Sequence, residues 1–171
     1  MSLNFLTDTP KELIFETVAE HLHLKNLKIN KQDNTRPWGG FFVIDEAEAE
    51  KFIQFYFPLL TQEELNISGK LSPKILVVAP NKRLSWQYHH RRAEIWKLIG
   101  GTAGVVTSDT DEEKETRYLG IGDIVQLKQG ERHRLIGLES WGIIAEIWRH
   151  TDAKSPSDED DIVRVQDDFG R

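Results

Sequence analysis

The sequence predicts a mainly β protein whose strands form an antiparallel sandwich or barrel. Gly, Pro, Asn or Asp separates most of the β-prone runs that follow Lys74, as turns between short strands require. Several short strands at such spacing are typical of all-β sandwiches and barrels. The predicted strands are Ile75 to Ala79, Arg83 to His90, Glu94 to Ile99, Gly101 to Thr107, Asp123 to Leu127, His133 to Ile136 and Gly142 to Trp148.

Length and composition exclude several classes of protein. The 171 residues suffice for one domain with a sizeable core, and 39% apolar with 29% charged residues is an ordinary globular balance. The net charge of -6 argues against a nucleic-acid partner, which would need a basic face. Because the chain has no cysteine, any bound metal must use nitrogen and oxygen ligands.

The N-terminal residues lack the basic region and the long apolar core of a signal peptide. The longest apolar runs are too short to cross a bilayer. We therefore expect a cytoplasmic protein with no membrane partner.

Two helices are predicted before the run of strands. Thr9 can cap a helix that has Pro10 at its first position and continues to about Leu22. After a turn and a strand between Arg36 and Ile44, a second helix is expected from Asp45 to Phe57, with Asp45 as its cap. Its apolar face must be buried in the chain or meet a partner chain, which leaves a homodimer open.

The expected organisation is a helical extension at residues 1–35 and a β domain at residues 36–171, with a helical insertion at 45–72. Thr61 to Glu64 predicts a further capping box within this insertion. The acidic segment from Thr151 to Arg171 is either a loose tail or an arm packed along the barrel.

A candidate metal site lies between Pro80 and Trp96. Gln87 and His89 would share one face of an extended strand, since residues two apart point the same way. A turn at about Arg91 to Ala93 would return Glu94 beside them in a hairpin. Amide, imidazole and carboxylate form a ligand set for a divalent metal, and His133 is the best candidate for the fourth ligand.

Four motifs occur in order along residues 36–171. They are Arg36-Pro37-Trp38-Gly39; Leu84-Ser85-x-Gln87-x-His89-His90 with Arg92-Ala93-Glu94-x-Trp96 and Gly101-Thr102-Ala103; Gly130-x-x-His133-Arg134-Leu135; and Glu159 to Arg164 with Asp168 to Arg171. Together they resemble the type II phosphomannose isomerases, whose domain also forms the C-terminal part of bifunctional mannose-1-phosphate guanylyltransferases. The resemblance implies a cupin-type antiparallel double-stranded β-helix, or jelly-roll barrel.

The resemblance implies that Gln87, His89, Glu94 and His133 bind a divalent ion, and zinc is the ion expected. It also implies isomerisation of mannose 6-phosphate to fructose 6-phosphate through a cis-enediol, which needs a base and a cation for the phosphate. The candidate catalytic residues are Arg92 and Glu146, and the candidate phosphate-binding residues are Lys82 and Arg92. Trp86, Trp96 and Trp148 are candidates either for a sugar-stacking wall or for the core.

Some residues depart from the family pattern. Arg91 and Ile95 stand where the relatives commonly have histidine, and Lys128 stands where they have proline. The changes at Arg91 and Ile95, together with a catalytic base that the sequence does not clearly assign, leave open an alternative, a non-catalytic cupin that binds a sugar or a sugar phosphate. A third hypothesis is a subunit whose helix at Asp45 to Phe57 recruits a partner.

Overall fold

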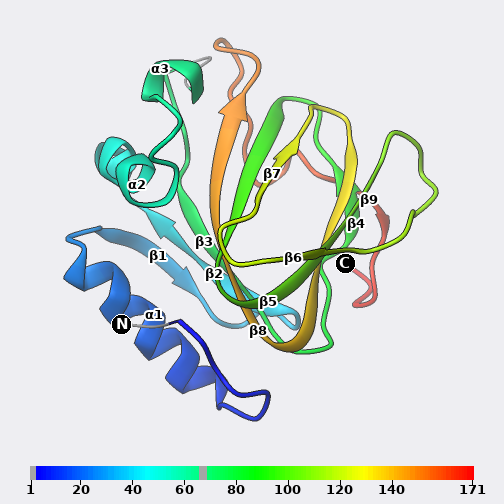
Figure 1. Cartoon of the computed structure of the whole chain (residues 1–171). Coiled ribbons are helices and arrows are strands. Elements are labelled where there is room, and N and C mark those ends of the chain that lie inside the picture. Colours follow the sequence, from blue (N-terminus) through cyan, green and yellow to red (C-terminus); the bar gives the residue numbers. More distant parts are fainter. Residues whose placement is uncertain (1–2, 66–68) are drawn as a thin grey trace.

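The described residues, 3–65 and 69–171, form one curled antiparallel sheet with helices on one side, as the computed structural model shows (Figure 1). The mainly β, antiparallel prediction is confirmed. Strand pairing runs in the order β1-β2-β3-β8-β4-β9, and β5 pairs with β6, β7 and β8. The strands are β1 (Ile29–Asp33), β2 (Gly39–Ile44), β3 (Lys74–Val78), β4 (Trp86–Tyr88), β5 (Arg92–Ser108), β6 (Arg117–Leu119), β7 (Ile124–Leu127), β8 (Arg132–His150) and β9 (Val163–Gln166).

Two long strands, β5 and β8, pair with each other from Arg92–His150 to Ser108–Arg132 and form the spine of the sheet. The sequence predicts two short strands in place of each. Register shifts beside Gly100 and Gly101 bend β5 without ending it. Gly101 has φ +67°, and a Cβ there would lie 1.6 Å from the carbonyl oxygen of Trp141, so only glycine fits.

The strand β8 pairs with different strands along its length. Its first part pairs with β4 at Gln87–His133, and its second part pairs with β3 from Gly142–Val78 to Glu146–Lys74. Strand alternation then sorts the side chains into an inner and an outer layer. On β3, Leu76 and Val78 enter the barrel interior, whereas Ile75 and Val77 face the helices.

The helices cover the outer face of β2, β3 and β8 (Figure 1). They are α1 (Lys11–Leu24), the short 3₁₀ helix η1 (Glu46–Glu48), α2 (Ala49–Tyr56) and α3 (Gln62–Leu65). Phe15 of α1 stacks on Phe42 of β2 with 5.2 Å between ring centroids. The apolar face of α2, including Phe52 and Ile53, is buried in this same cluster, so it packs against the core of its own chain.

Local signals predicted most helix starts. The Asp45 side chain accepts a hydrogen bond from the Ala47 N–H, and Thr61 and Glu64 form the predicted reciprocal capping box. The Thr9 cap is wrong, because Pro10 takes the capping position and no side chain caps α1. Part of the predicted 45–72 insertion, residues 66–68, lies outside the described residues.

The C-terminal segment is an arm packed along the barrel. Its strand β9 pairs with β4, and Arg83 holds Asp168 through two hydrogen bonds of 2.6 and 2.9 Å. The sequence does not predict the strands β1, β6 and β9, because each has only three to five residues and gains its partners only in the folded sheet.

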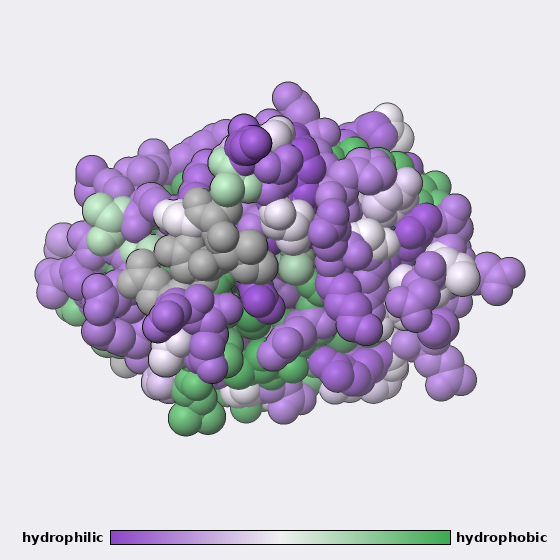
Figure 2. Space-filling view, turned by 90° about the horizontal axis from the view of Figure 1, so that it is seen from above, coloured by the Kyte–Doolittle hydropathy of each residue, from purple (hydrophilic) through white to green (hydrophobic). Residues whose placement is uncertain are grey.

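Figure 2 shows that the face seen from above is mainly hydrophilic, with apolar residues reaching the surface in limited patches. Among the described residues, none of the helices is long and apolar enough to cross a membrane.

Candidate functional site

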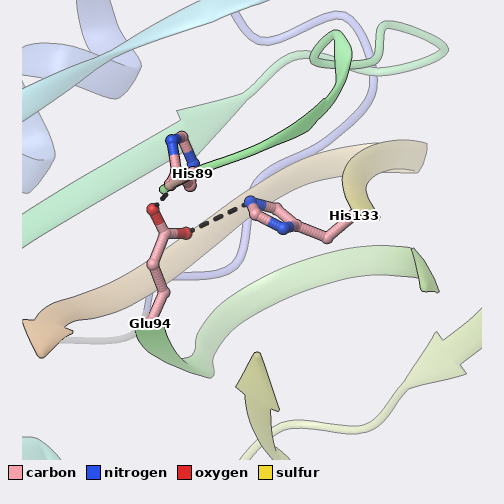
Figure 3. A group of neighbouring side chains, drawn as sticks. All are labelled: His89, Glu94 and His133. Carbon is pink, nitrogen blue, oxygen red and sulfur yellow. Dashed lines mark ion pairs between the residues drawn. The ribbon is translucent and has the colours of Figure 1, made fainter. Parts of the chain in front are cut away.

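Two histidines flank one carboxylate inside the barrel (Figure 3). His89 Nε2 lies 3.1 Å from Glu94 Oε1, and His133 Nε2 lies 3.4 Å from Glu94 Oε2. All three side chains are buried, and their ligand atoms lie within 4.8 Å of one another. The structure thus brings together three of the four predicted metal ligands.

The predicted hairpin is wrong, although the convergence that it was meant to explain is present. The strands β4 and β5 do not pair with each other, because β8 lies beside both: His133 is opposite Gln87 of β4 and Thr107 of β5. His89 lies just beyond the end of β4, so its position is set by its contacts rather than by strand alternation. The long-range β8 pairing therefore assembles the cluster.

Hydrogen bonds orient both imidazoles. The Nδ1–H of His89 donates to the carbonyl oxygen of Asp161 at 2.6 Å, and that of His133 donates to the carbonyl oxygen of Glu131 at 2.9 Å. Each Nε2 then presents a lone pair to the carboxylate. Metal-binding histidines commonly have such a carbonyl partner on the other ring nitrogen.

A cation fits this arrangement. His133 Nε2 and Glu94 Oε2 are buried, and neither atom has a hydrogen-bond partner within the described part of the chain. Buried polar atoms are almost always partnered, so two orphaned lone-pair donors facing each other indicate a missing positive group. Two imidazoles and one carboxylate suit Zn²⁺ and related divalent ions.

Gln87, the fourth predicted ligand, lies next to the cluster. It is opposite His133 in register and lines the same cavity as Glu94. Its Oε1 accepts a hydrogen bond from the Ser85 hydroxyl at 2.5 Å, which fixes the direction of the amide oxygen.

Arg92 forms hydrogen bonds with the cluster and with the segment beside it. Its guanidinium donates to Glu94 Oε1 at 2.7 Å and to His89 Nε2 at 3.1 Å, so it brings positive charge to the same atoms. It also donates to the Ser157 hydroxyl at 2.9 Å and to the carbonyl oxygen of Asp158 at 3.0 Å. These contacts make Arg92 a positioning residue for the cluster.

The segment from Ser157 to Asp161 holds the loop that carries His89 in place through hydrogen bonds. The Asp161 carboxylate accepts hydrogen bonds from the backbone N–H groups of His90 and Arg91 at 3.0 and 2.9 Å. The Ser157 hydroxyl donates to the same carboxylate at 2.6 Å. The C-terminal arm therefore completes the site that the sequence predicts from residues 87–133.

The pKa values of the two buried carboxyl groups, Glu94 and Glu146, shift in opposite directions. Burial acts to raise the pKa of Glu94, but the Arg92 guanidinium beside it helps to hold that pKa well below its ordinary value. Burial, reinforced by the charge of Glu94, raises the pKa of Glu146 to about 7. Burial also lowers the pKa of His89, which keeps its imidazole neutral and able to bind a cation.

A cavity of about 420 Å³ adjoins the cluster. Strand register explains how its inner wall forms: Glu94 is opposite Trp148, and Glu146 is opposite both Trp96 and Lys74. Trp96 Nε1–H donates to Glu146 Oε1 at 2.9 Å. The lining includes Arg36, Trp38, Lys74, Gln87, Arg92, Glu94, Trp96, Glu146, Trp148, Glu159, Arg164 and Arg171.

Other predicted site residues lie elsewhere. Lys82 lines a separate cavity with Arg83 and Tyr118, so the structure does not bring it to Glu94. Trp86 is buried and donates to the carbonyl oxygen of Asp111 at 2.8 Å, away from the cavity lining.

Two cations lie over the indole ring of Trp148. Lys74 Nζ and the Arg92 guanidinium carbon each lie 3.6 Å from its ring centroid. Cations at this distance interact with the ring, so they occupy positions that a stacked sugar would need.

The departures from the family pattern lie away from the cavity lining. Ile95 is buried in the helix-covered hydrophobic cluster. The Arg91 side chain bonds to Ser155 and Asp158 at the surface, and Lys128 is exposed. None of the three changes the residues that line the cavity.

Sequence reasoning missed Lys74 and Arg164 as cavity residues. Lys74 begins an apolar strand, and Arg164 alternates with Val163 and Val165, which is typical of a strand with one polar face. Neither pattern indicates which face lines a cavity until the partner strand is known.

Comparison with known protein families and sequences points to one family. Residues 45–167 match the family model described as "Mannose-6-phosphate isomerase C-terminal". The alginate biosynthesis protein AlgA of Pseudomonas aeruginosa is 31% identical over 128 residues, which cover 73% of this chain and 24% of AlgA. The mannose-1-phosphate guanylyltransferase of Escherichia coli is 32% identical over 118 residues, which cover 69% of this chain and 23% of that protein. The chain thus spans about a quarter of the length of these relatives.

Solved structures show the same fold at low sequence identity. The capsular polysaccharide assembling protein CapF of Staphylococcus aureus gives a TM-score of 0.53 at 12% identity, covering 82% of this chain and 34% of CapF. The DMSP lyase structures RdDddP and RnDddQII give a TM-score of 0.52 at 13% identity, covering 96% of this chain and 74% of the matched one. The cupin-type barrel expected from the resemblance is confirmed, and the chain belongs to the mannose-6-phosphate isomerase C-terminal family.

Proposed function

We propose that this chain is a metal-dependent sugar-phosphate aldose–ketose isomerase that interconverts mannose 6-phosphate and fructose 6-phosphate. The observation that carries the proposal is the pairing of an orphaned His–Glu–His cluster with a second buried carboxyl whose pKa is about 7, both at one cavity. Family membership supports the substrate class, since the matching family is described by that activity.

The metal would be held by Gln87, His89, Glu94 and His133. When bound, a divalent ion such as Zn²⁺ would act as a Lewis acid toward the carbonyl oxygen of the open-chain sugar.

Glu146 is the proposed base. The net reaction moves one proton from C2 to C1 and one from the C2 hydroxyl to the C1 oxygen, through a cis-enediol. In the metal-free site the pKa of Glu146 is about 7, chiefly because of burial, and a carboxyl with a raised pKa can take a carbon-bound proton and return it. Trp96 orients this carboxylate through its 2.9 Å hydrogen bond.

Arg92 supports the chemistry through other residues. Its guanidinium is held against Glu94 and His89, so it keeps their charges and orientations fixed. Lys82 remains a predicted phosphate partner from the sequence, but it does not line this cavity, and the proposal does not use it.

The direct test is exchange of the C2 proton of mannose 6-phosphate in deuterated water by purified protein loaded with zinc. We expect exchange together with formation of fructose 6-phosphate, and we expect Glu146→Gln to abolish both while retaining the metal. Elemental analysis of the wild type and of His133→Ala checks the metal site independently.

The alternative is a non-catalytic cupin that binds the sugar phosphate. Its motivation was the loss of histidine at Arg91 and Ile95, yet both positions lie away from the cavity. Calorimetric binding of mannose 6-phosphate with neither exchange at C2 nor formation of fructose 6-phosphate would favour this alternative and would exclude the isomerase.

A further inference from the structure

We propose that Arg164 forms an anion subsite at one end of the cavity and binds the phosphate group of the substrate. The inference rests on the proposed function for the identity of the ligand, and on the arrangement of the cavity for the position of the subsite. It replaces the expectation that Lys82 or Arg92 holds the phosphate.

Strand register places Arg164 in line with the metal cluster. Gln87 of β4 is opposite His133 of β8 on one side and opposite Arg164 of β9 on the other. Residues opposite each other in antiparallel strands share a face, with Cβ atoms about 5 Å apart. His133, Gln87 and Arg164 therefore form one row across three strands, and both Gln87 and Arg164 line the cavity.

The other cations of the cavity are already paired with carboxylates. Lys74 pairs with Glu159, Arg92 with Glu94, Arg36 with Asp33 and Arg171 with Asp167. Arg164 is different: across residues 3–65 and 69–171, no carboxylate lies within ion-pair distance of it and it has no side-chain hydrogen-bond partner. Its five N–H donors are free for a ligand.

The surroundings of Arg164 favour an anion. Burial and the neighbouring charges of Arg171 and Arg36 lower its pKa, while Asp167 and Glu159 act in the opposite direction. Arg36, Arg164 and Arg171 line one cavity, and of these three guanidinium groups Arg36 and Arg171 already have carboxylate partners in Asp33 and Asp167, so Arg164 is the one left to bind a further negative group. A phosphate monoester carries that charge and accepts the paired hydrogen bonds that a guanidinium donates.

The subsite also orients the substrate. With the phosphate at Arg164, on the β9 side of Gln87, the remainder of the sugar extends toward the cluster on the other side. C6 and its phosphate would then lie at one end of the cavity, and the reacting C1 and C2 would lie near Glu94 and Glu146. An unphosphorylated sugar would lack this anchor.

The experiment measures binding of inorganic phosphate to the full chain by calorimetry, in chelator-treated protein so that phosphate cannot bind a metal. The variants are Arg164→Met and the control Lys82→Met, which removes the same charge from a cavity that does not contain Glu94. We expect Arg164→Met to raise the phosphate Kd about tenfold or more, the effect typical of one charge-assisted guanidinium contact. We expect Lys82→Met to change it less than twofold.

Kinetics separate the subsite from the proposed activity. In metal-loaded protein, Arg164→Met should raise the KM for mannose 6-phosphate about tenfold with a smaller change in kcat, and it should not change the metal content. Phosphate binding that depends on Arg164 in a protein without isomerase activity would retain the subsite and reject the isomerase. Active protein in which Arg164→Met leaves both the phosphate Kd and the KM unchanged would overturn the subsite alone, as would an equal effect of Lys82→Met.

Discussion

Replacing Trp96 with phenylalanine should raise the pKa of Glu146. Trp96 Nε1–H donates a hydrogen bond of 2.9 Å to Glu146 Oε1 and thereby favours the ionised carboxylate. Phenylalanine retains most of the ring but has no donor. The pKa of Glu146, about 7 in the native protein, should therefore move upward.

The size of the effect follows from burial. Trp96 is 1% exposed and Glu146 is 4% exposed, so water cannot readily replace the lost donor. A hydrogen bond to a charged group contributes about 1.5–3 kcal/mol, and 1.36 kcal/mol corresponds to about one pH unit. We therefore expect the pKa of Glu146 in Trp96→Phe to rise by roughly one to two pH units.

The assay is a pH titration of the carboxyl by difference infrared spectroscopy in chelator-treated protein, with Glu146→Gln used to assign the band. The control is Trp86→Phe, because Trp86 is equally buried but donates to the carbonyl oxygen of Asp111 at 2.8 Å. Both variants lose similar packing, and only Trp96→Phe should shift the titration. An unchanged or lower pKa in Trp96→Phe, or an equal shift in Trp86→Phe, would refute the reasoning.

Three further predictions concern stability and metal affinity. Folding raises the pKa of Glu146 from 4.5 to about 7, so the protein loses stability as pH rises through this range and the buried carboxyl ionises. At pH 8 the free energy of unfolding of Glu146→Gln, measured in urea, should therefore be about 3 kcal/mol higher than that of the wild type, and the difference should be much smaller at pH 5. Asp161→Ala should weaken zinc binding about 10- to 100-fold in chelator competition, since it releases the loop that carries His89, whereas Asp109→Ala on the exposed hairpin should have no effect. Burial lowers the pKa of His150 from 6.5 to about 4, and the Ser157 N–H donates to its Nδ1 at 2.9 Å. As pH decreases, this histidine is therefore protonated in the unfolded chain before it is protonated in the folded protein, and the free energy of unfolding should fall between pH 6.5 and pH 4. A free energy of unfolding that does not change with pH in this range would contradict the assignment.

The candidate ligands could be predicted because their chemistry is local. Gln87, His89 and Glu94 lie within eight positions, and the motif around His133 is recognisable by itself. The geometry that joins them could not be predicted correctly. A hairpin is the simplest way to bring neighbouring residues together, but β8 takes the hydrogen-bonding positions beside both β4 and β5.

The lengths of β5 and β8 were missed for a related reason. Gly100 and Gly101 interrupt the β-prone pattern of β5, and turn-like glycines normally indicate a break between strands. Here they allow a bend in a continuous strand, because Gly101 adopts φ +67° where Trp141 leaves no room for a side chain.

The sequence by itself determined the class of fold, the two helices and the kinds of atoms that meet in the barrel, since periodicity, capping residues and ligand chemistry are written in short segments. Only the tertiary structure decided which cations line the cavity, which tryptophan ring those cations lie over and how the C-terminal arm supports His89. Those features depend on register between strands far apart in the chain, and a shift of one residue would turn each side chain to the opposite face.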